Sequence, residues 1–197
     1  MKEISVKGTL RTELGKKASR ELRKANSVPC NLYGEAKDEN GKPVAKAFVT
    51  TNDELRNLIY SPDIYTVNLN IDGAECKAIL KEIQFHPVKD NILHVDFYEI
   101  TDTKPIIMEV PIKLEGLAEG VKAGGKLVAN VRKLKVKAVY SNIPEKLVIN
   151  VAHLGLGKTI KVGELNFEGL ELMNSTEVVV CQVKMTRSAM AAAAQKK

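Results

Sequence analysis

A stripe of cations near the N-terminus carries the clearest chemical signal in the sequence. It consists of Lys16, Lys17, Arg20, Arg23 and Lys24. On a helix, at about 100° per residue, these side chains fall within a stripe roughly 120° wide. Positive charge at this density fits the phosphate backbone of a nucleic acid. The alternative is a solvated helix face, although such faces usually mix acids among the cations, and spacing alone leaves both interpretations open.

The opposite side of the same predicted helix is apolar. It is formed by Leu14, Ala18, Leu22 and Ala25. We expect this side to dock on a sheet and to leave the cations exposed. The acid of this segment, Glu21, falls just beyond the edge of the stripe.

Two predicted strands between residues 83 and 98 place a second set of polar groups together. Because the strands are joined by a short turn, we expect them to be neighbours. Their shared polar face would carry Gln84, His86, His94 and Asp96. Their other side would carry Ile83, Phe85, Leu93, Val95 and Phe97. Amide, imidazole and carboxylate groups can hydrogen-bond base edges and 2′-hydroxyls, but an ordinary exposed face has the same pattern.

Catalysis and metal binding are not expected. His94 and Asp96 resemble the base half of a nucleophilic triad, yet residues two apart on a strand usually lie too far apart for that hydrogen bond, and a nucleophile motif is lacking. The histidines have neither a ligand helix nor a Cys partner. Gly157-Lys158-Thr159 matches the end of a P-loop, but Ala152 stands where the motif needs Gly. We therefore expect no cofactor and no small-molecule substrate.

The elements that must position these groups follow from hydrophobic periodicity. The pattern in the first half predicts helices over 16–25 and from the cap Thr51 to about Tyr60. It predicts strands over 4–10, 28–33, 44–49, 65–71, 75–86 and 92–100, with a hairpin at Asp72-Gly73. These elements make a mixed antiparallel sheet or barrel with two helices.

The second half is predicted to be mostly β. Strands are expected over 106–115, 133–140, 147–151, 159–162 and 177–183, and 116–125 is expected to be a loop with four glycines. The fold class is therefore α+β. The expected division is a first domain over 1–99, a β domain over 100–185 and a disordered tail over 186–197.

Charge and cysteine content bound the class of protein. The 197 residues carry a formal net charge of +6. Residues 1–24 alone carry eight Lys/Arg against three Asp/Glu, which favours an acidic partner at that end. The three cysteines are widely spaced and suit a reducing cytosol. A signal peptide and a membrane-spanning apolar run are both missing, so we expect a cytoplasmic protein without a membrane partner.

Two stretches resemble a known family. The first reads RTELGKKASRELR at 11–23 and VPCNLYG at 28–34; the second reads IQFHPVK at 83–89 and LHVDF at 93–97. They look like the bacterial large-subunit ribosomal protein twenty-five, in the long two-domain form called the general stress protein CTC type. VPI at 110–112, GVKAGG at 120–125 and NIPE at 142–145 resemble the β domain of that form.

The resemblance implies a non-enzymatic protein that binds 5S rRNA in the central protuberance of the large ribosomal subunit, beside other large-subunit components. By analogy, RNA contact falls on Arg11, Lys16, Ser19, Arg20, Tyr33, Gln84, His86, His94 and Asp96, and the cation stripe adds Lys17 and Arg23. Many members place Arg where this chain has Phe85, so a contact made by that Arg is not carried over. The alternative is a stress-related protein–protein adaptor that acts through the β domain.

Overall fold

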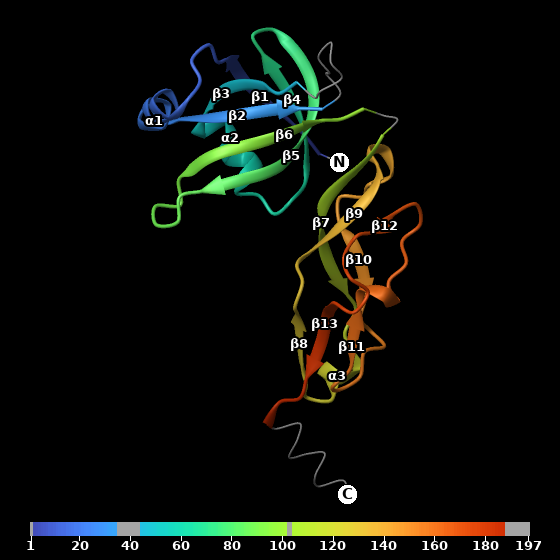
Figure 1. Cartoon of the computed structure of the whole chain (residues 1–197). Helices are drawn as coiled ribbons and strands as arrows, with labels where there is room; N and C mark the ends of the chain where they lie inside the picture. The colour runs from blue at the N-terminus through green and yellow to red at the C-terminus, as the bar shows by residue number, and fades with distance from the viewer. Residues whose placement is uncertain (1, 35–43, 102–103, 188–197) are drawn as a thin grey trace, which may run out of the picture. The chain divides into compact units, whose positions relative to one another are not determined.

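The computed structural model describes residues 2–34, 44–101 and 104–187. The chain divides into two compact units, Met1–Lys104 and Pro105–Lys197, called here the N-terminal unit and the C-terminal unit. Six strands and two helices form the described part of the first, and the second is rich in strands (Figure 1). The α+β prediction is thus confirmed. The expected disordered tail falls almost entirely on 188–197, outside the described residues.

The N-terminal unit is a closed barrel with the strand order β1-β3-β2-β6-β5-β4. Its strands are β1 (Lys2–Leu10), β2 (Ser27–Tyr33), β3 (Lys46–Thr51), β4 (Tyr65–Ile71), β5 (Ala74–Phe85) and β6 (Ile92–Glu99). Two pairs, β1 with β4 and β2 with β6, are parallel, and the other pairs are antiparallel. Closure pairs every strand on both sides, which removes the exposed edges of an open sheet.

Local sequence signals explain several of the connections. Asp72 and Gly73 both take positive φ, 49° and 89°, as a two-residue hairpin between β4 and β5 requires. The helix α2 (Asn52–Ile59) is capped by Thr51, whose hydroxyl accepts a hydrogen bond from the Glu54 amide. The hairpin and this helix start are where the sequence predicts them.

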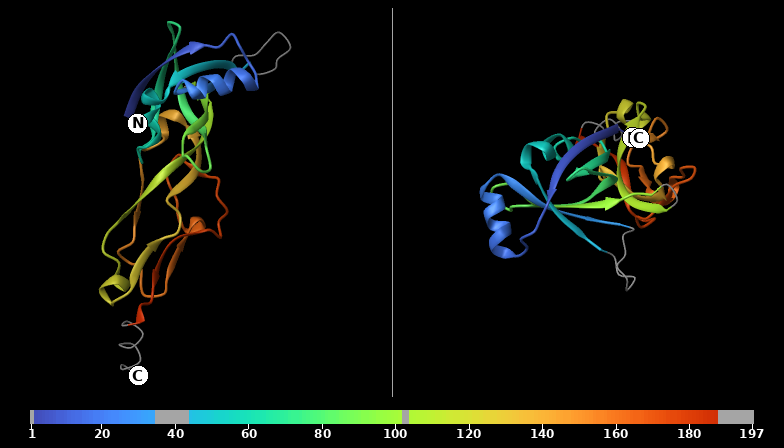
Figure 2. Two further views of the ribbon diagram at one scale, coloured as in Figure 1. Left: turned by 90° about the vertical axis from the view of Figure 1, so that its left-hand side faces the viewer. Right: turned by 90° about the horizontal axis from the view of Figure 1, so that it is seen from above.

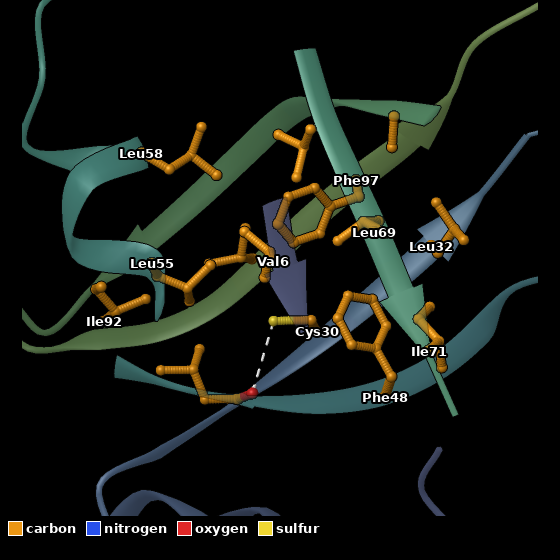
Figure 3. Packing of buried hydrophobic residues seen from close by; sticks show 14 residues of the cluster. Val6, Cys30, Leu32, Phe48, Leu55, Leu58, Leu69, Ile71, Ile92 and Phe97 are labelled. Carbon is orange, nitrogen blue, oxygen red and sulfur yellow. Dashed lines mark hydrogen bonds between the residues drawn. The ribbon is translucent and has the colours of Figure 1, made fainter. Parts of the chain in front are cut away.

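Alternating side chains of all six strands fill the barrel. Phe48 and Phe97 are fully buried with ring centroids 5.8 Å apart, and Leu55 and Leu58 of α2 pack at the same core (Figure 3). Cys30 lies among them and its thiol donates to the Val28 carbonyl. Burial raises the pKa of this thiol well above its usual range, so Cys30 serves as a small core residue.

The C-terminal unit consists of two small sheets with the orders β10-β7-β9-β12 and β11-β13-β8. Their strands are β7 (Pro105–Glu115), β8 (Lys126–Ala129), β9 (Lys133–Val139), β10 (Leu147–Asn150), β11 (Thr159–Lys161), β12 (Glu171–Leu172) and β13 (Val179–Lys184). Two short 3₁₀ turns, Tyr140–Asn142 and Val162–Glu164, connect them. The sequence did not predict the short strands β8 and β12.

The expected loop over 116–125 contains a helical turn, α3 (Glu119–Lys122), so that prediction is wrong. One of the glycines that suggested a loop, Gly120, is required by packing instead. Gly120 is buried, and a Cβ there would lie 2.6 Å from backbone atoms of Gly155 and Leu156. Glycine is needed because two backbone segments approach closely, which composition alone does not reveal.

Candidate nucleic-acid interface

One outward face of the barrel runs across β2, β6 and β5. Gln84 lies directly opposite His94, and Glu82 lies opposite Asp96, in the antiparallel β5–β6 pair. On the other side of β6, the parallel register sets Asn31 beside Asp96 and Tyr33 beside Tyr98. Because paired residues share a side and alternate residues of a strand return to it, these groups form a single surface. We call it the β6 face, made of Asn31, Tyr33, Glu82, Gln84, His94, Asp96 and Tyr98.

His94 and Asp96 interact directly within the β6 face. Their Nδ1 and Oδ1 atoms lie 3.3 Å apart, with side chains 20% and 21% exposed. The two side chains thus approach each other more closely than two positions along a strand suggest, although the contact is an ion-pair distance rather than the hydrogen bond of a triad. The β5–β6 register shifts on both sides of this stretch, between Leu80 and Glu82 and between Gln84 and Phe85. Such bulges increase the local twist of the strand pair.

Tyr33 extends the β6 face next to Tyr98. The two rings meet edge to face with centroids 5.8 Å apart and an interplanar angle of 71°. Burial, followed by the nearby carboxylates of Asp96 and Glu82, raises the pKa of the Tyr33 phenol. Tyr33 therefore keeps its proton and can donate a hydrogen bond.

His86 lies just beyond the end of β5 and has a local role. Its Nδ1 accepts hydrogen bonds from the amides of Val88 and Lys89, both at 3.2 Å. These bonds hold the β5–β6 turn. Since Nδ1 accepts, Nε2 carries the ring proton and remains the donor nitrogen. The sequence grouped His86 with Gln84 but did not predict its use in the turn.

Phe85 does not point into the core as expected, because 42% of its surface is exposed. It is the last residue of β5 and pairs with Ile92 after the register shift. Ile83, two residues earlier, packs against the core as predicted. The alternating apolar pattern of β5 thus continues to Phe85, although the buried core of the barrel ends before this residue.

The cationic helix is α1 (Lys16–Lys24), and it stands at one end of the barrel (Figures 1 and 2). None of its residues is buried, and a groove of about 410 Å³ lies beside Leu22 and Val49. The predicted docking on the sheet is therefore only partial, and Leu14 is 70% exposed. Leu14 precedes the Gly15 N-cap, so the helical spacing used to place it does not apply.

Four of the five predicted cations, Lys16, Lys17, Arg20 and Lys24, are exposed on α1. The fifth, Arg23, is also exposed but donates from Nε to the Leu93 carbonyl on β6 at 3.0 Å. Because His94 follows Leu93, the cation stripe and the β6 face are adjacent within one unit. The structure thereby brings together the two polar clusters that the sequence indicated separately.

Arg11 and Ser19 are engaged with each other at the start of α1. Arg11 Nη2 lies 3.2 Å from both the Ser19 hydroxyl and the Glu13 carbonyl. The Ser19 hydroxyl donates to the Gly15 carbonyl at 2.9 Å. Arg11 Nε is buried and has no hydrogen-bond partner. These two residues brace the turn into the helix.

The electrostatics of the two surfaces differ. α1 presents cations, whereas the β6 face carries Glu82 and Asp96 between neutral polar groups. A polyanion would be attracted by α1 and would need hydrogen bonds to lie against the β6 face. Among the described residues, no group of three or more His, Cys, Asp or Glu could hold a metal ion. None of the helices in the described ranges has the length and apolar character to cross a membrane.

The sequence did not single out Asn31, Glu82 or Tyr98 as part of the surface. Asn31 and Tyr98 belong to the surface because β2 pairs in parallel with β6. These two strands are far apart in the sequence, and the sequence pattern does not indicate that they pair. Glu82 joins it through a register shift. Period-two alternation gives the side of a strand, but not its neighbour or its bulges.

Comparison with known proteins covers both units. The model of the ribosomal L25p family matches residues 6–97, and that of the C-terminal domain of ribosomal protein TL5 matches 105–187. A large ribosomal subunit protein bL25 from Phocaeicola vulgatus is 66% identical over 194 residues, covering 98% of each chain. Proteins of the same name are 62% identical in Bacteroides thetaiotaomicron over 98% of each chain, and 57% identical in Porphyromonas gingivalis over 100% of each chain.

Proposed function

The chain belongs to the ribosomal L25p family, and we propose that within the large ribosomal subunit it binds 5S rRNA in the central protuberance. Membership makes it a structural ribosomal protein rather than an enzyme, and places it with the ribosome in the cytoplasm. The observation that carries the RNA proposal is the Arg23–Leu93 contact, which sets a cationic helix beside a polar strand face in one unit.

The exposed cations of α1 bind phosphates in this proposal. Lys16, Lys17 and Arg20 lie on its solvent side and none is buried. Phosphate contacts of this kind supply affinity and orient the RNA, but they do not discriminate between sequences. The helix therefore accounts for attraction to any RNA.

The β6 face supplies the discrimination. Asp96 repels phosphate, so near RNA it must accept a hydrogen bond from a base or a 2′-hydroxyl. Gln84 and His94, directly opposite each other, and the protonated Tyr33 phenol add donors and acceptors beside it. Carboxylate, amide, imidazole and phenol groups on one face are suited to an RNA with exposed base edges.

The other residues implied by the resemblance support these contacts. Arg11 and Ser19 brace the start of α1, and His86 holds the β5–β6 turn. We propose that they set the position of RNA-binding groups, and that the Nε2–H of His86 stays available for an RNA acceptor. The C-terminal unit contacts other large-subunit components in this account, since its family match favours a ribosomal role over the adaptor role.

The test is recovery of RNA with the tagged full-length chain from cells that also contain its ribosomal RNA. We expect 5S rRNA to be enriched over tRNA in the washed fraction. The control is a chain carrying Lys16→Ala, Lys17→Ala and Arg20→Ala, which should recover less RNA of every kind. Equal recovery of 5S rRNA and tRNA by the unaltered chain would refute the proposal.

A further inference from the structure

Arg23 joins two elements that otherwise make limited contact. Its Nε donates to the Leu93 carbonyl at 3.0 Å, across 70 positions of sequence. α1 has nine residues and none of them is buried. An isolated helix of this length is not stable in water, so contacts with the barrel must hold it.

The Leu93 carbonyl is available because of the register shift in β6. Gln84 pairs with His94 and Phe85 pairs with Ile92, so Leu93 is skipped on the β5 side. The β2 pairing begins only at Val95. A residue passed over by a bulge is left without its ladder bonds, and a carbonyl in that position needs another donor. Arg23 provides it.

The start of α1 is held independently of Arg23. Arg11 bonds the Ser19 hydroxyl, and the Arg11 amide donates to the Ala47 carbonyl on β3 at 3.0 Å. The Arg23 bond acts near the other end of the helix. Arg20 lies between Ser19 and Arg23, and Lys17 lies two residues before Ser19, so the two attachments together fix the direction of both cations relative to β6.

We propose that Arg23 is a positioning residue, whose Nε–Leu93 bond holds α1 beside β6 so that the α1 cations and the β6 face engage one RNA together. The RNA part of this inference rests on the proposed function. It differs from the expectation drawn from the cation stripe, in which Arg23 is one more phosphate contact. A positioning role requires the hydrogen-bond donor at Nε of Arg23. A phosphate-binding role requires the positive charge of the Arg23 side chain.

Two substitutions separate donor from charge at this position. In Arg23→Gln the amide nitrogen stands as many bonds from Cα as Arg Nε, so a donor is kept and the charge is lost. In Arg23→Lys a methylene occupies that place, so the charge is kept and the donor there is lost. Arg, Gln and Lys have similar helix propensities, so helix formation itself is matched. Arg20→Gln is the control for losing one cation of the stripe.

The first measurement is amide hydrogen exchange of α1 in the free full-length chain. Arg23→Gln should keep most of the protection of the unaltered chain, whereas Arg23→Lys should exchange roughly fivefold faster across α1, the size of one ordinary hydrogen bond. Equal protection in all three chains would overturn the positioning role. This result does not depend on any RNA.

The second measurement is the affinity for 5S rRNA at several salt concentrations. Positioning predicts that Arg23→Lys binds severalfold more weakly with an unchanged salt slope, and that Arg23→Gln stays close to the unaltered chain. Arg20→Gln should flatten the slope. If Arg23→Gln flattens it equally while Arg23→Lys binds normally, Arg23 is a phosphate contact and the inference fails. If the unaltered chain shows no preference for 5S rRNA, the proposed function is refuted instead. The hydrogen-exchange result still decides whether Arg23 holds α1 against the barrel.

Discussion

His94 Nδ1 lies 3.3 Å from Asp96 Oδ1 on the outward side of β6. A carboxylate at this distance favours a proton on the facing Nδ1, which leaves Nε2 as the acceptor of a neutral ring. The carboxylate keeps further lone pairs for other donors. The pair therefore presents acceptors toward a partner, and a partner rich in amino and hydroxyl donors, such as a base edge with its ribose, complements it.

The first prediction concerns this pair. Asp96→Ala removes an acceptor and releases the His94 ring, so the preference for 5S rRNA over an unrelated RNA should fall by about 1–3 kcal/mol. The salt dependence should stay nearly unchanged, because no phosphate contact is lost. The measurement is parallel titration of both RNAs at several salt concentrations. If the variant binds every RNA more tightly by the same factor, Asp96 is only a repulsive surface charge.

The second prediction concerns phosphate binding by α1. Arg20→Ala should weaken binding to 5S and to unrelated RNA alike, and it should reduce the log–log salt slope by roughly 0.7–0.9. Arg56, an exposed cation on α2, is the matched control, and Arg56→Ala should leave the slope unchanged. Equal slopes for the Arg20 and Arg56 variants would show that α1 is not the phosphate-binding element.

The third prediction concerns independence of the two units. A fragment ending at Lys104 should fold alone, since its core residues all come from the barrel and α2. It should bind 5S rRNA as tightly as the full chain, whereas a fragment beginning at Pro105 should not. Circular dichroism establishes folding and titration establishes binding. Comparable 5S affinity of the second fragment would move the binding site away from α1 and the β6 face.

The fourth prediction tests the tight backbone contact of the C-terminal unit. Gly120→Ala places a Cβ 2.6 Å from backbone atoms of Gly155 and Leu156, and it should destabilise that unit by about 1–3 kcal/mol. Gly155→Ala is the control, because its nearest contact would be a lysine side chain at 3.8 Å. The measurement is thermal unfolding together with 5S titration. Equal melting temperatures for the two variants would contradict the close approach, and a large loss of 5S affinity in Gly120→Ala would contradict the separation of functions.

Local chemistry made much of the barrel predictable. The Asp72-Gly73 hairpin, the Thr51 cap and the alternation of β4 depend on neighbouring residues only, and all three lie where the sequence indicates. The cation stripe of α1 was visible for the same reason. Helical and strand periodicities are properties of the chain itself.

Contacts between residues that are distant in the sequence could not be predicted from local patterns. The Arg23–Leu93 bond depends on a register shift, and the bracing of Ser19 by Arg11 depends on how the chain enters α1. The sequence pattern predicts a loop at Gly120, because the role of this glycine arises from a segment more than thirty positions away. Spacing identified the polar residues, but their hydrogen-bond partners required the fold.

The most direct test of the RNA assignment is the affinity of the purified full-length chain for 5S rRNA and for an unrelated RNA of equal length, each measured at several salt concentrations. Attraction by α1 should give both RNAs a similar salt slope. Readout by the β6 face should give 5S rRNA a lower dissociation constant than the unrelated RNA at every salt concentration. The ratio of the two constants should persist as salt is raised. Equal affinities that decline together with salt would contradict the account, because they would leave binding by charge alone.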